Sequence, residues 1–330
     1  MSQVQRRQFL IVAGALLAAP LGANAQRPAR IRRIGMLIPV RAADAAGNIE
    51  ALRQGLRELG YIEGQHIAIE ARYADGRDER FADLAVELAS LKVDVIVTWG
   101  TPAARAAKRA TRTIPIVTAS VVDPVGTGLI ASLARPGGNL TGVTNGGAEL
   151  SRKSVQLLKE IVPGARRIGV LWNPSNPINP VMFRESQIAA DALKIRLQSF
   201  GISDPNELDS VLAMMMQKER PDALVVLSDL MLQTYRSRIV EFVAKMRLPA
   251  TYERKAWVDA GGLISYGVSL ADNFRRAATF VDKIFKGVNP VDLPVEDPTK
   301  FELIINLRTA KALDITIPQS VLLRADKVIE

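Results

Sequence analysis

The residue types that carry most enzyme chemistry are scarce in this chain. Its 330 residues include no cysteine and a single histidine, His66. Disulfides, thiolate metal sites, cysteine nucleophiles and clusters of histidine ligands are therefore excluded. His66 precedes an expected strand, and the sequence around it shows no arrangement typical of a catalytic triad, so we interpret it as structural. We expect no catalytic residue and no metal site.

The one pattern typical of nucleotide binding stands in the wrong context. Gly126–Ala131 fits the Gly-x-Gly-x-x-Ala fingerprint of a dinucleotide-binding turn. That turn directly follows the first strand of its sheet, whereas here the pattern follows the fourth expected strand, after Asp123 and Pro124. The chain also has no Walker A loop and no Gly-x-Ser-x-Gly nucleophile turn. We therefore expect no cofactor and no enzymatic activity.

Aromatic side chains, which make up only 5% of the chain, gather at the ends of expected strands. These residues are Trp99, Trp172, Tyr252 and Tyr266. Open parallel sheets bind their ligands beyond the carboxyl ends of the strands. The four side chains are therefore candidates for a box around an apolar or aromatic ligand. The alternative is that they only cover sheet edges.

A helix start at one of these strand ends offers an anion site. Thr101, Pro102 and Ala103 open an expected helix, whose free N–H groups and dipole favour a carboxylate. Thr101 is otherwise a plain N-cap residue, with Pro102 at the first helical position.

Polar side chains follow three more strands. The segment Asn173–Pro177 offers side-chain amides from Asn173 and Asn176, or else is simple turn chemistry. Asp123 either receives a ligand ammonium group or caps a helix that begins at Val125. Asp229 stands in the equivalent place in the second half of the chain, so we include it as a candidate ligand residue.

Short apolar runs alternate with amphipathic ones along the chain, whose length suits two domains of about 150 residues each. Apolar residues at helical spacing predict one helix that ends at Gly60, which acts as a C-cap. The same spacing predicts a second helix that begins at Asp78. Strand, helix, strand in this rhythm predicts parallel sheets with helices on both faces. The expected strands of the first half are Ile34–Ile38, Ile67–Ala71, Val93–Thr98 and Ile114–Ala119.

The pattern then restarts, which indicates a structural repeat. A helix with Leu208 on its apolar face lies in the second copy, and we expect its methionines, Met214–Met216, to fill the core. The matched segments are Arg32–Leu37 with Arg166–Leu171, Asp94–Val97 with Asp222–Val225, and Ile114–Ile116 with Leu248–Ala250.

Residues 1–25 have the three parts of a secretory signal peptide. Arg6 and Arg7 form the basic start, Phe9–Leu21 is the apolar run, and Ala23–Ala25 is the cleavage site. The apolar run is shorter than the roughly 20 residues that cross a bilayer, so an uncleaved anchor is the alternative rather than the expectation. The arginine pair fits either twin-arginine or Sec export. We expect a soluble protein exported to the periplasm.

The chain is basic, with 43 Lys and Arg against 34 Asp and Glu and a formal net charge of +9. The basic residues are spread along the chain rather than gathered in one stripe, which favours a solvated surface over a nucleic-acid interface. An exported protein also rarely meets nucleic acid. We expect no nucleic-acid partner.

The chain resembles the substrate-binding proteins of ABC transporters, in the branch with a type I periplasmic-binding fold. The resemblance covers nearly the whole chain, and its segments follow in one order. These segments are Gln54–Gln65, Gly100–Ala103, Ile114–Val117, Asp123–Val125, Arg135–Val143, Gly261–Gly267, Pro298–Asn306 and Ala310–Leu313.

The resemblance implies an α/β fold of two doubly wound parallel-sheet lobes, a Venus-flytrap with a ligand cleft between the lobes. Residues 31–145 with about 267–290 would form the first lobe, and residues 146–266 with about 291–330 the second. We expect hinges near Thr144–Glu149 and near Tyr266–Ser269, where the chain crosses between lobes.

The resemblance also implies a function. Relatives bind amino acids, some of them aromatic, and the family's ligand loops fall here on Thr101–Ala103, Asp123, Asn173–Asn176, Asp229 and Tyr266. We expect a monomeric exported receptor that binds a small amino acid-like ligand and delivers it to the permease of an ABC importer, where a separate ATPase supplies the energy. The alternative is an exported sensor that presents its ligand to a membrane receptor.

Overall fold

The computed structural model describes residues 30–146, 149–217 and 220–330. By its internal contacts, Arg32–Glu330 forms one compact unit, and every element below belongs to it. The expected signal peptide, residues 1–25, lies outside the described residues. Within the described part of the chain, we find no helix with the length and apolarity needed to cross a membrane.

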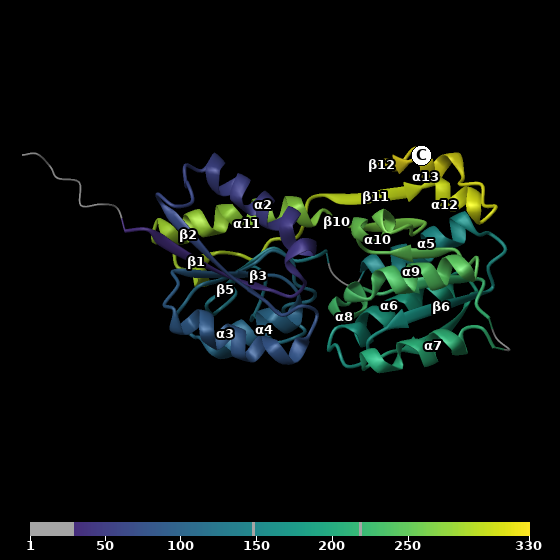
Figure 1. Ribbon diagram of the computed structural model, residues 1–330, viewed down its shortest axis with the longest axis horizontal. Helices are drawn as coiled ribbons and strands as arrows, with labels where there is room; N and C mark the ends of the chain where they lie inside the picture. The colour runs from purple at the N-terminus through teal and green to yellow at the C-terminus, as the bar shows by residue number, and fades with distance from the viewer. Residues whose placement is uncertain (1–29, 147–148, 218–219) are drawn as a thin grey trace, which may run out of the picture. The chain divides into compact units, whose positions relative to one another are not determined.

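The first sheet has five parallel strands, in the order β2-β1-β3-β4-β5. Helices α2 (Ala42–Glu58) and α11 (Leu270–Phe285) pack together on one face, and α3 (Phe81–Ser90) and α4 (Thr101–Ala110) cover the other (Figure 1). A short 3₁₀ turn, η1 (Asp78–Arg80), precedes α3. The strands are β1 (Arg32–Ile38), β2 (Ile67–Tyr73), β3 (Val95–Thr98), β4 (Ile116–Thr118) and β5 (Leu140–Gly142).

The core around this sheet is mainly aliphatic, as the scarcity of aromatic residues predicts. β1 reads as a continuous apolar run because helices cover both faces of a parallel sheet. The apolar face of α2 is buried, and the helix ends at Glu58, followed by the C-cap Leu59 and by Gly60, whose φ of 89° suits a glycine after a helix end. Gly55 lets α2 approach α11, because a Cβ atom there would lie 2.8 Å from the carbonyl oxygen of Arg275.

The second sheet has seven strands, in the order β12-β11-β10-β9-β8-β6-β7. All neighbours run parallel except β10 and β11, because β10 leads out to α11 and β11 brings the chain back beside it. The strands are β6 (Arg167–Trp172), β7 (Arg196–Gly201), β8 (Ala223–Val226), β9 (Ala250–Tyr252), β10 (Ile264–Val268), β11 (Phe301–Asn306) and β12 (Lys327–Ile329).

Helices surround the second sheet as they do the first, which confirms the predicted α/β class with two parallel-strand sheets (Figure 1). The helices are α5 (Glu149–Ile161), α6 (Asn179–Ala192), α7 (Leu208–Met214), α8 (Leu230–Thr234), α9 (Arg236–Lys245), α10 (Lys255–Asp259), α12 (Leu307–Ala312) and α13 (Gln319–Leu322). Two 3₁₀ turns, η2 (Pro205–Glu207) and η3 (Pro290–Asp292), complete the elements.

The predicted repeat is confirmed at the level of single hydrogen bonds. In the first sheet, the backbone N–H of Arg33 donates to the Asp94 carboxylate at 2.7 Å. In the second, the N–H of Arg167 donates to the Asp222 carboxylate at 2.9 Å. The same loop-to-strand bond, at 2.8 Å, joins Ile96 to Pro115 and Leu224 to Pro249.

Two expectations about helix starts are wrong. Gly100, with a φ of 85°, takes the N-cap position of α4, so Thr101 is the first helical residue, and its hydroxyl donates to the carbonyl of Val122 at 3.4 Å. No helix begins at Val125 among the described residues, because the chain forms successive turns there. Asp123 instead caps its own turn, accepting from the N–H of Gly126 at 2.9 Å.

The expectation that Met214–Met216 all fill the core is also wrong. Only Met215 is buried, while Met214 and Met216 are 54% and 59% exposed. Three consecutive residues at a helical spacing cannot share one face, since each step turns the side chain by about 100°, and here α7 ends at Met214.

Three segments connect the two sheets, and they are tied to one another. They follow β5, β10 and η3. The Thr144 hydroxyl donates to the Asp297 carboxylate at 2.6 Å, and the N–H of Ser269 donates to the carbonyl of Lys300 at 3.3 Å. The Asn273 side chain donates to the carbonyl of Thr144 at 3.3 Å. Residues 147 and 148 of the first expected hinge lie outside the described residues.

Candidate functional site

A cavity of about 390 Å³, here called the strand-end pocket, lies where several strands end. Val40 follows β1, Trp99 follows β3, and Arg254 follows β9. Leu230 and Gln233 come from α8, which follows β8. Strand ends of both sheets therefore contribute to one pocket, as the topological rule for parallel sheets predicts.

The Trp99 side chain forms a fixed apolar wall of this pocket. It is only 1% exposed, and its indole meets the ring of Phe274 edge-on, with centroids 5.0 Å apart. Beside it, Leu230 approaches the bare backbone of Gly100, where a Cβ atom would lie 3.0 Å from the Leu230 Cδ1 atom. The wall suits an apolar or aromatic group.

Arg254 brings a positive charge to the same pocket. Burial lowers the pKa of Arg254, whereas the negative charge of the neighbouring Glu253 raises it. Burial raises the pKa of Glu253, while hydrogen bonds from Ser228 and the charge of Arg254 lower it. Among the described residues, no hydrogen bond or close ion pair holds the guanidinium group of Arg254. A desolvated guanidinium of this kind suits a planar anion such as a carboxylate.

Two ion pairs hold charged groups around the strand-end pocket, while Glu302 lines it without an ion pair among the described residues. Arg236 meets Asp44 at 2.6 Å, and Lys255 meets Asp259 at 2.7 Å. The carboxamide of Gln233 accepts a hydrogen bond from the Trp257 indole at 3.0 Å. Arg254 is therefore the cation of this pocket with bonding capacity left for a ligand.

The structure brings together three polar residues that the sequence singles out. The side-chain amides of Asn173 and Asn176 donate to the carboxylate of Asp229, at 3.1 and 2.9 Å. The same carboxylate caps α8, since it accepts from the N–H of Leu232 at 3.0 Å. Burial raises the pKa of Asp229, and these hydrogen bonds oppose that rise. The cluster fixes the start of α8, which carries Leu230 and Gln233 into the pocket.

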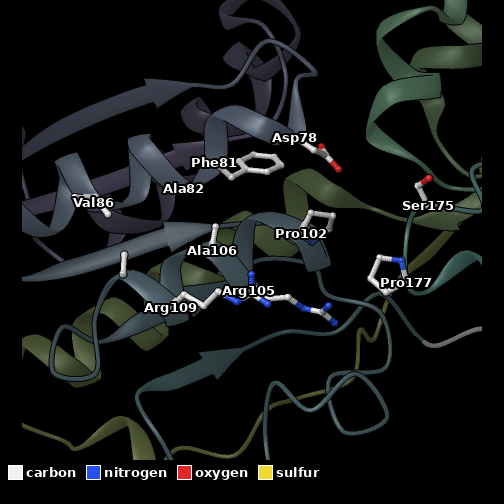
Figure 2. A pocket seen from close by; sticks show the side chains of 11 residues that line it. Asp78, Phe81, Ala82, Val86, Pro102, Arg105, Ala106, Arg109, Ser175 and Pro177 are labelled. Atoms are coloured by element: carbon white, nitrogen blue, oxygen red, sulfur yellow. The ribbon is translucent and has the colours of Figure 1, made fainter. Parts of the chain in front are cut away.

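A second cavity, the α3–α4 pocket, has a volume of about 380 Å³. Figure 2 shows Asp78 and Arg105 both pointing toward the loop that carries Ser175 and Pro177. The pKa of Asp78 is raised to about 6, first by desolvation and then by the charges of Asp229 and Glu79. The Asp229 cluster and the α3–α4 pocket are thus electrostatic neighbours.

The remaining candidates of the first half of the chain lie apart from the strand-end pocket. Thr101 and Ala103 are buried in α4, and Pro102 lines the α3–α4 pocket. Asp123, with a φ of 38°, closes its turn as described above. A role for these residues in ligand binding stays a prediction.

The three other aromatic candidates pack around the second sheet. Trp172 stacks on Phe183 with centroids 5.0 Å apart and donates to the Ser199 hydroxyl at 2.8 Å. Tyr252 stacks on Trp257 at 4.8 Å, and Tyr266 on Phe301 at 6.1 Å. Of the four strand-end aromatics, Trp99 lines the strand-end pocket and these three do not. Their contact with a ligand stays a prediction.

Sequence reasoning missed Arg254, Gln233 and Leu230 as pocket residues. The sequence does contain a signal for Arg254. It is the second residue after β9, at a strand end that Tyr252 already marks as a candidate site. Asp229 caps a helix that begins directly after β8, and Leu230 and Gln233 lie in this helix. Recognising that cap would have placed both residues near the strand end.

The chain is similar in sequence to known binding proteins. A family model described as ABC transporter substrate binding protein matches residues 33–329. A tyrosine-binding protein of Clostridioides difficile (strain R20291) is 29% identical over 263 residues, which cover 79% of this chain and 75% of that protein.

Two solved structures extend the likeness to three dimensions. An ABC domain from Streptococcus pneumoniae in complex with L-Trp has a TM-score of 0.84 and 28% identity, over 91% of this chain and all of that chain (100%). A ligand-free, open substrate binding protein with adhesive properties from Clostridium difficile has a TM-score of 0.68 and 25% identity, over 91% of this chain and 99% of that chain. With its family model matched from residue 33 to residue 329 and its fold shared with these binding proteins, the chain belongs to the ABC transporter substrate binding protein family.

Proposed function

We propose that this protein is an exported receptor that binds a small amino acid-like solute and delivers it to the permease of an ABC importer. The observation that carries the proposal is the guanidinium group of Arg254, which has no hydrogen-bond partner among the described residues and lies in a pocket walled by Trp99. A buried charge is costly unless an opposite charge meets it. A ligand carboxylate supplies that charge, and Trp99 then receives the apolar part of the ligand.

The names of two relatives support this ligand class. One is a tyrosine-binding protein, and the other was solved in complex with L-Trp. Both ligands combine a carboxylate with an aromatic side chain. The pocket volume of about 390 Å³ lies within the usual range for small-molecule sites. We therefore propose an aromatic or large apolar amino acid as the ligand, and no catalytic turnover.

The proposed mechanism is hinge closure of two lobes around the ligand. We keep the predicted division into residues 31–145 with about 267–290 and residues 146–266 with about 291–330. Three contacts of α8–α9, one with helix α2 and two with loops of the first sheet, support closure as the ligand-binding motion. Arg236 pairs with Asp44, Leu230 abuts Gly100, and Thr234 lies so close to Gly76 that a Cβ atom there would sit 2.0 Å from its hydroxyl.

Export to the periplasm and action as a monomer complete the proposal. The support for export is the basic, apolar and small-residue pattern of residues 1–25. Membership of a family of transporter binding proteins is consistent with it.

Native mass spectrometry of the purified protein tests the proposal. We expect a bound mass equal to that of an amino acid, which is released on mild unfolding. Trp99→Ala should abolish the bound mass, while Met214→Ala, which changes an exposed side chain of α7 outside the strand-end pocket, should retain it. If the protein is empty and no amino acid raises its Tm in a thermal-shift screen, the proposal is wrong, since any ligand of the folded state must stabilise it.

A further inference from the structure

A separate cavity of about 230 Å³ lies beside the second sheet, and we call it the α9–α12 pocket. Its walls come from α9, from β9, from the segment before β10 and from α12. It shares no lining residue with the strand-end pocket or with the α3–α4 pocket. The proposed solute site therefore does not account for it.

The walls of this pocket are almost entirely apolar. Val240, Val243 and Leu248 contribute buried aliphatic side chains. Gly261 and Gly262 contribute bare backbone, and Gly262 lies so close to the ring of Tyr252 that a Cβ atom would sit 2.6 Å from its Cε2 atom. Larger residues at these glycines would fill the cavity or clash, so the sequence keeps the space open.

One polar group among these apolar walls is left without a partner. Tyr252 is only 1% exposed, and its ring is held by stacking on Trp257 with an interplanar angle of 13°. Its hydroxyl oxygen is buried and makes no hydrogen bond within the described residues. Burial raises the pKa of Tyr252, so the group stays a neutral O–H donor. Buried tyrosine hydroxyls normally find a partner, because an unmade hydrogen bond is costly.

The charge around the pocket limits what it can hold. Among the lining residues that the structure describes, Arg308 carries the one formal charge. Arg308 is exposed, and its Nε atom donates to the carbonyl oxygen of Glu330. A zwitterion would lose its hydration here without gaining a partner for its ammonium group. The interior suits a neutral molecule.

We propose that the α9–α12 pocket binds a small neutral molecule, a single aromatic ring with one hydroxyl or carbonyl group that accepts a hydrogen bond from Tyr252. The size fits, because an apolar cavity of about 150 Å³ in another protein already holds benzene. The site is distinct from the proposed amino acid site and gives the protein a second ligand of a different class.

The test uses p-cresol and toluene, which have the same ring and methyl group and differ by one hydroxyl. Isothermal titration of the purified protein should show that p-cresol binds about fivefold more tightly, the value of one net hydrogen bond. Tyr252→Phe should remove this preference and leave toluene binding unchanged. A preference that survives Tyr252→Phe overturns the role of the hydroxyl.

Blocking variants locate the site. Ala312→Phe in α12 and Ala244→Phe in α9 place a ring at the exposed rim of the pocket from two different helices, and each should abolish binding of both probes. Ala213→Phe, at an exposed position of α7, is the matched control and should bind normally. Absence of binding to the parent protein, or binding that survives both blocks, refutes the site. Binding that is lost in Trp99→Ala but kept in the blocked variants assigns the probes to the strand-end pocket and also refutes it.

Discussion

Asp78 stands at the edge of the α3–α4 pocket in a place that disfavours its charge. Its pKa is raised from 3.8 to about 6 by desolvation, by Asp229 and by Glu79. The folded chain therefore binds this proton more tightly than the unfolded chain does. Protonated Asp78 therefore stabilises the folded state. This contribution is complete below about pH 4 and is lost as the pH rises through about 6, because the slope of stability with pH follows the difference in bound protons between the two states.

Asp78→Asn should remove this part of the pH dependence. We expect the free energy of unfolding of the parent protein to fall between pH 4 and pH 6 relative to that of the variant, and the difference to be constant above pH 7. Urea unfolding across this range measures it, with Asp83→Asn in α3 as a control. Parallel curves for the parent protein and Asp78→Asn would contradict the assignment.

Single residues show how far the strand-end rule reaches. It placed Asn173, Asn176 and Asp229 at strand ends, and the structure brings them together because β6 and β8 are neighbouring strands. It did not tell on which face a side chain falls, since side chains of a strand alternate between faces. Trp172 consequently packs on Phe183 rather than lining the strand-end pocket.

At the scale of elements, the contact between α2 and α11 depends on one missing side chain. Gly55 faces the carbonyl oxygen of Arg275 and the Cβ atom of Ala278, with 2.8 and 2.9 Å to an added Cβ atom. Gly47, on the same helix, has nothing within 4 Å of such an atom. The two glycines therefore predict opposite effects of the same substitution.

Gly55→Ala should lower the free energy of unfolding by about 1–3 kcal/mol, because the helices must move apart. Gly47→Ala should raise it by about 0.5–1 kcal/mol, because alanine loses less backbone entropy in a helix. Urea denaturation of both variants measures the two values. An unchanged free energy of unfolding in Gly55→Ala would mean that α2 and α11 move apart without cost.

Elements were predictable where one physical pattern dominates. The buried strands and the repeat follow from apolar runs and from the aspartates Asp94 and Asp222, which bind equivalent backbone N–H groups. Helix ends were harder, because the positive φ of Gly100 and the end of α7 near Met215 depend on contacts made by the folded chain. The antiparallel pair of β10 and β11 follows from the path through α11, which local patterns do not encode.

At the scale of the whole molecule, the proposed closure would depend on contacts of α8–α9 with α2 and with loops of the first sheet. The ion pair between Arg236 and Asp44 spans 2.6 Å, and both side chains are 23% exposed. A partly exposed pair contributes about 0–1 kcal/mol. If this ion pair forms only in the closed state, its free energy adds to the affinity for the ligand.

Asp44→Asn should therefore weaken amino acid binding by about two- to fivefold with little change in the ligand-free Tm. Asp209→Asn, which removes the pair between α7 and Arg238 of α9, should leave affinity unchanged. Isothermal titration measures both. Equal affinities for the parent protein and Asp44→Asn would separate this ion pair from closure.

The family and the two-lobe fold could be predicted from the sequence because they depend on patterns spread over the whole chain. The pocket could be predicted only in part. Arg254 was missed because the sequence alone does not show that its guanidinium is desolvated and has no hydrogen-bond partner among the described residues.

The most direct test of the account is the affinity of Arg254→Met for L-Trp and L-Tyr, measured by isothermal titration. Methionine keeps an unbranched stem and removes the charge. The account predicts that the parent protein binds at least one of these amino acids and that Arg254→Met binds it about 10- to 100-fold more weakly, the value of charged hydrogen bonds. Lys255→Met, which removes a cation already paired with Asp259, should bind nearly as the parent does. Unchanged affinity in Arg254→Met would contradict the assignment of the carboxylate to this pocket.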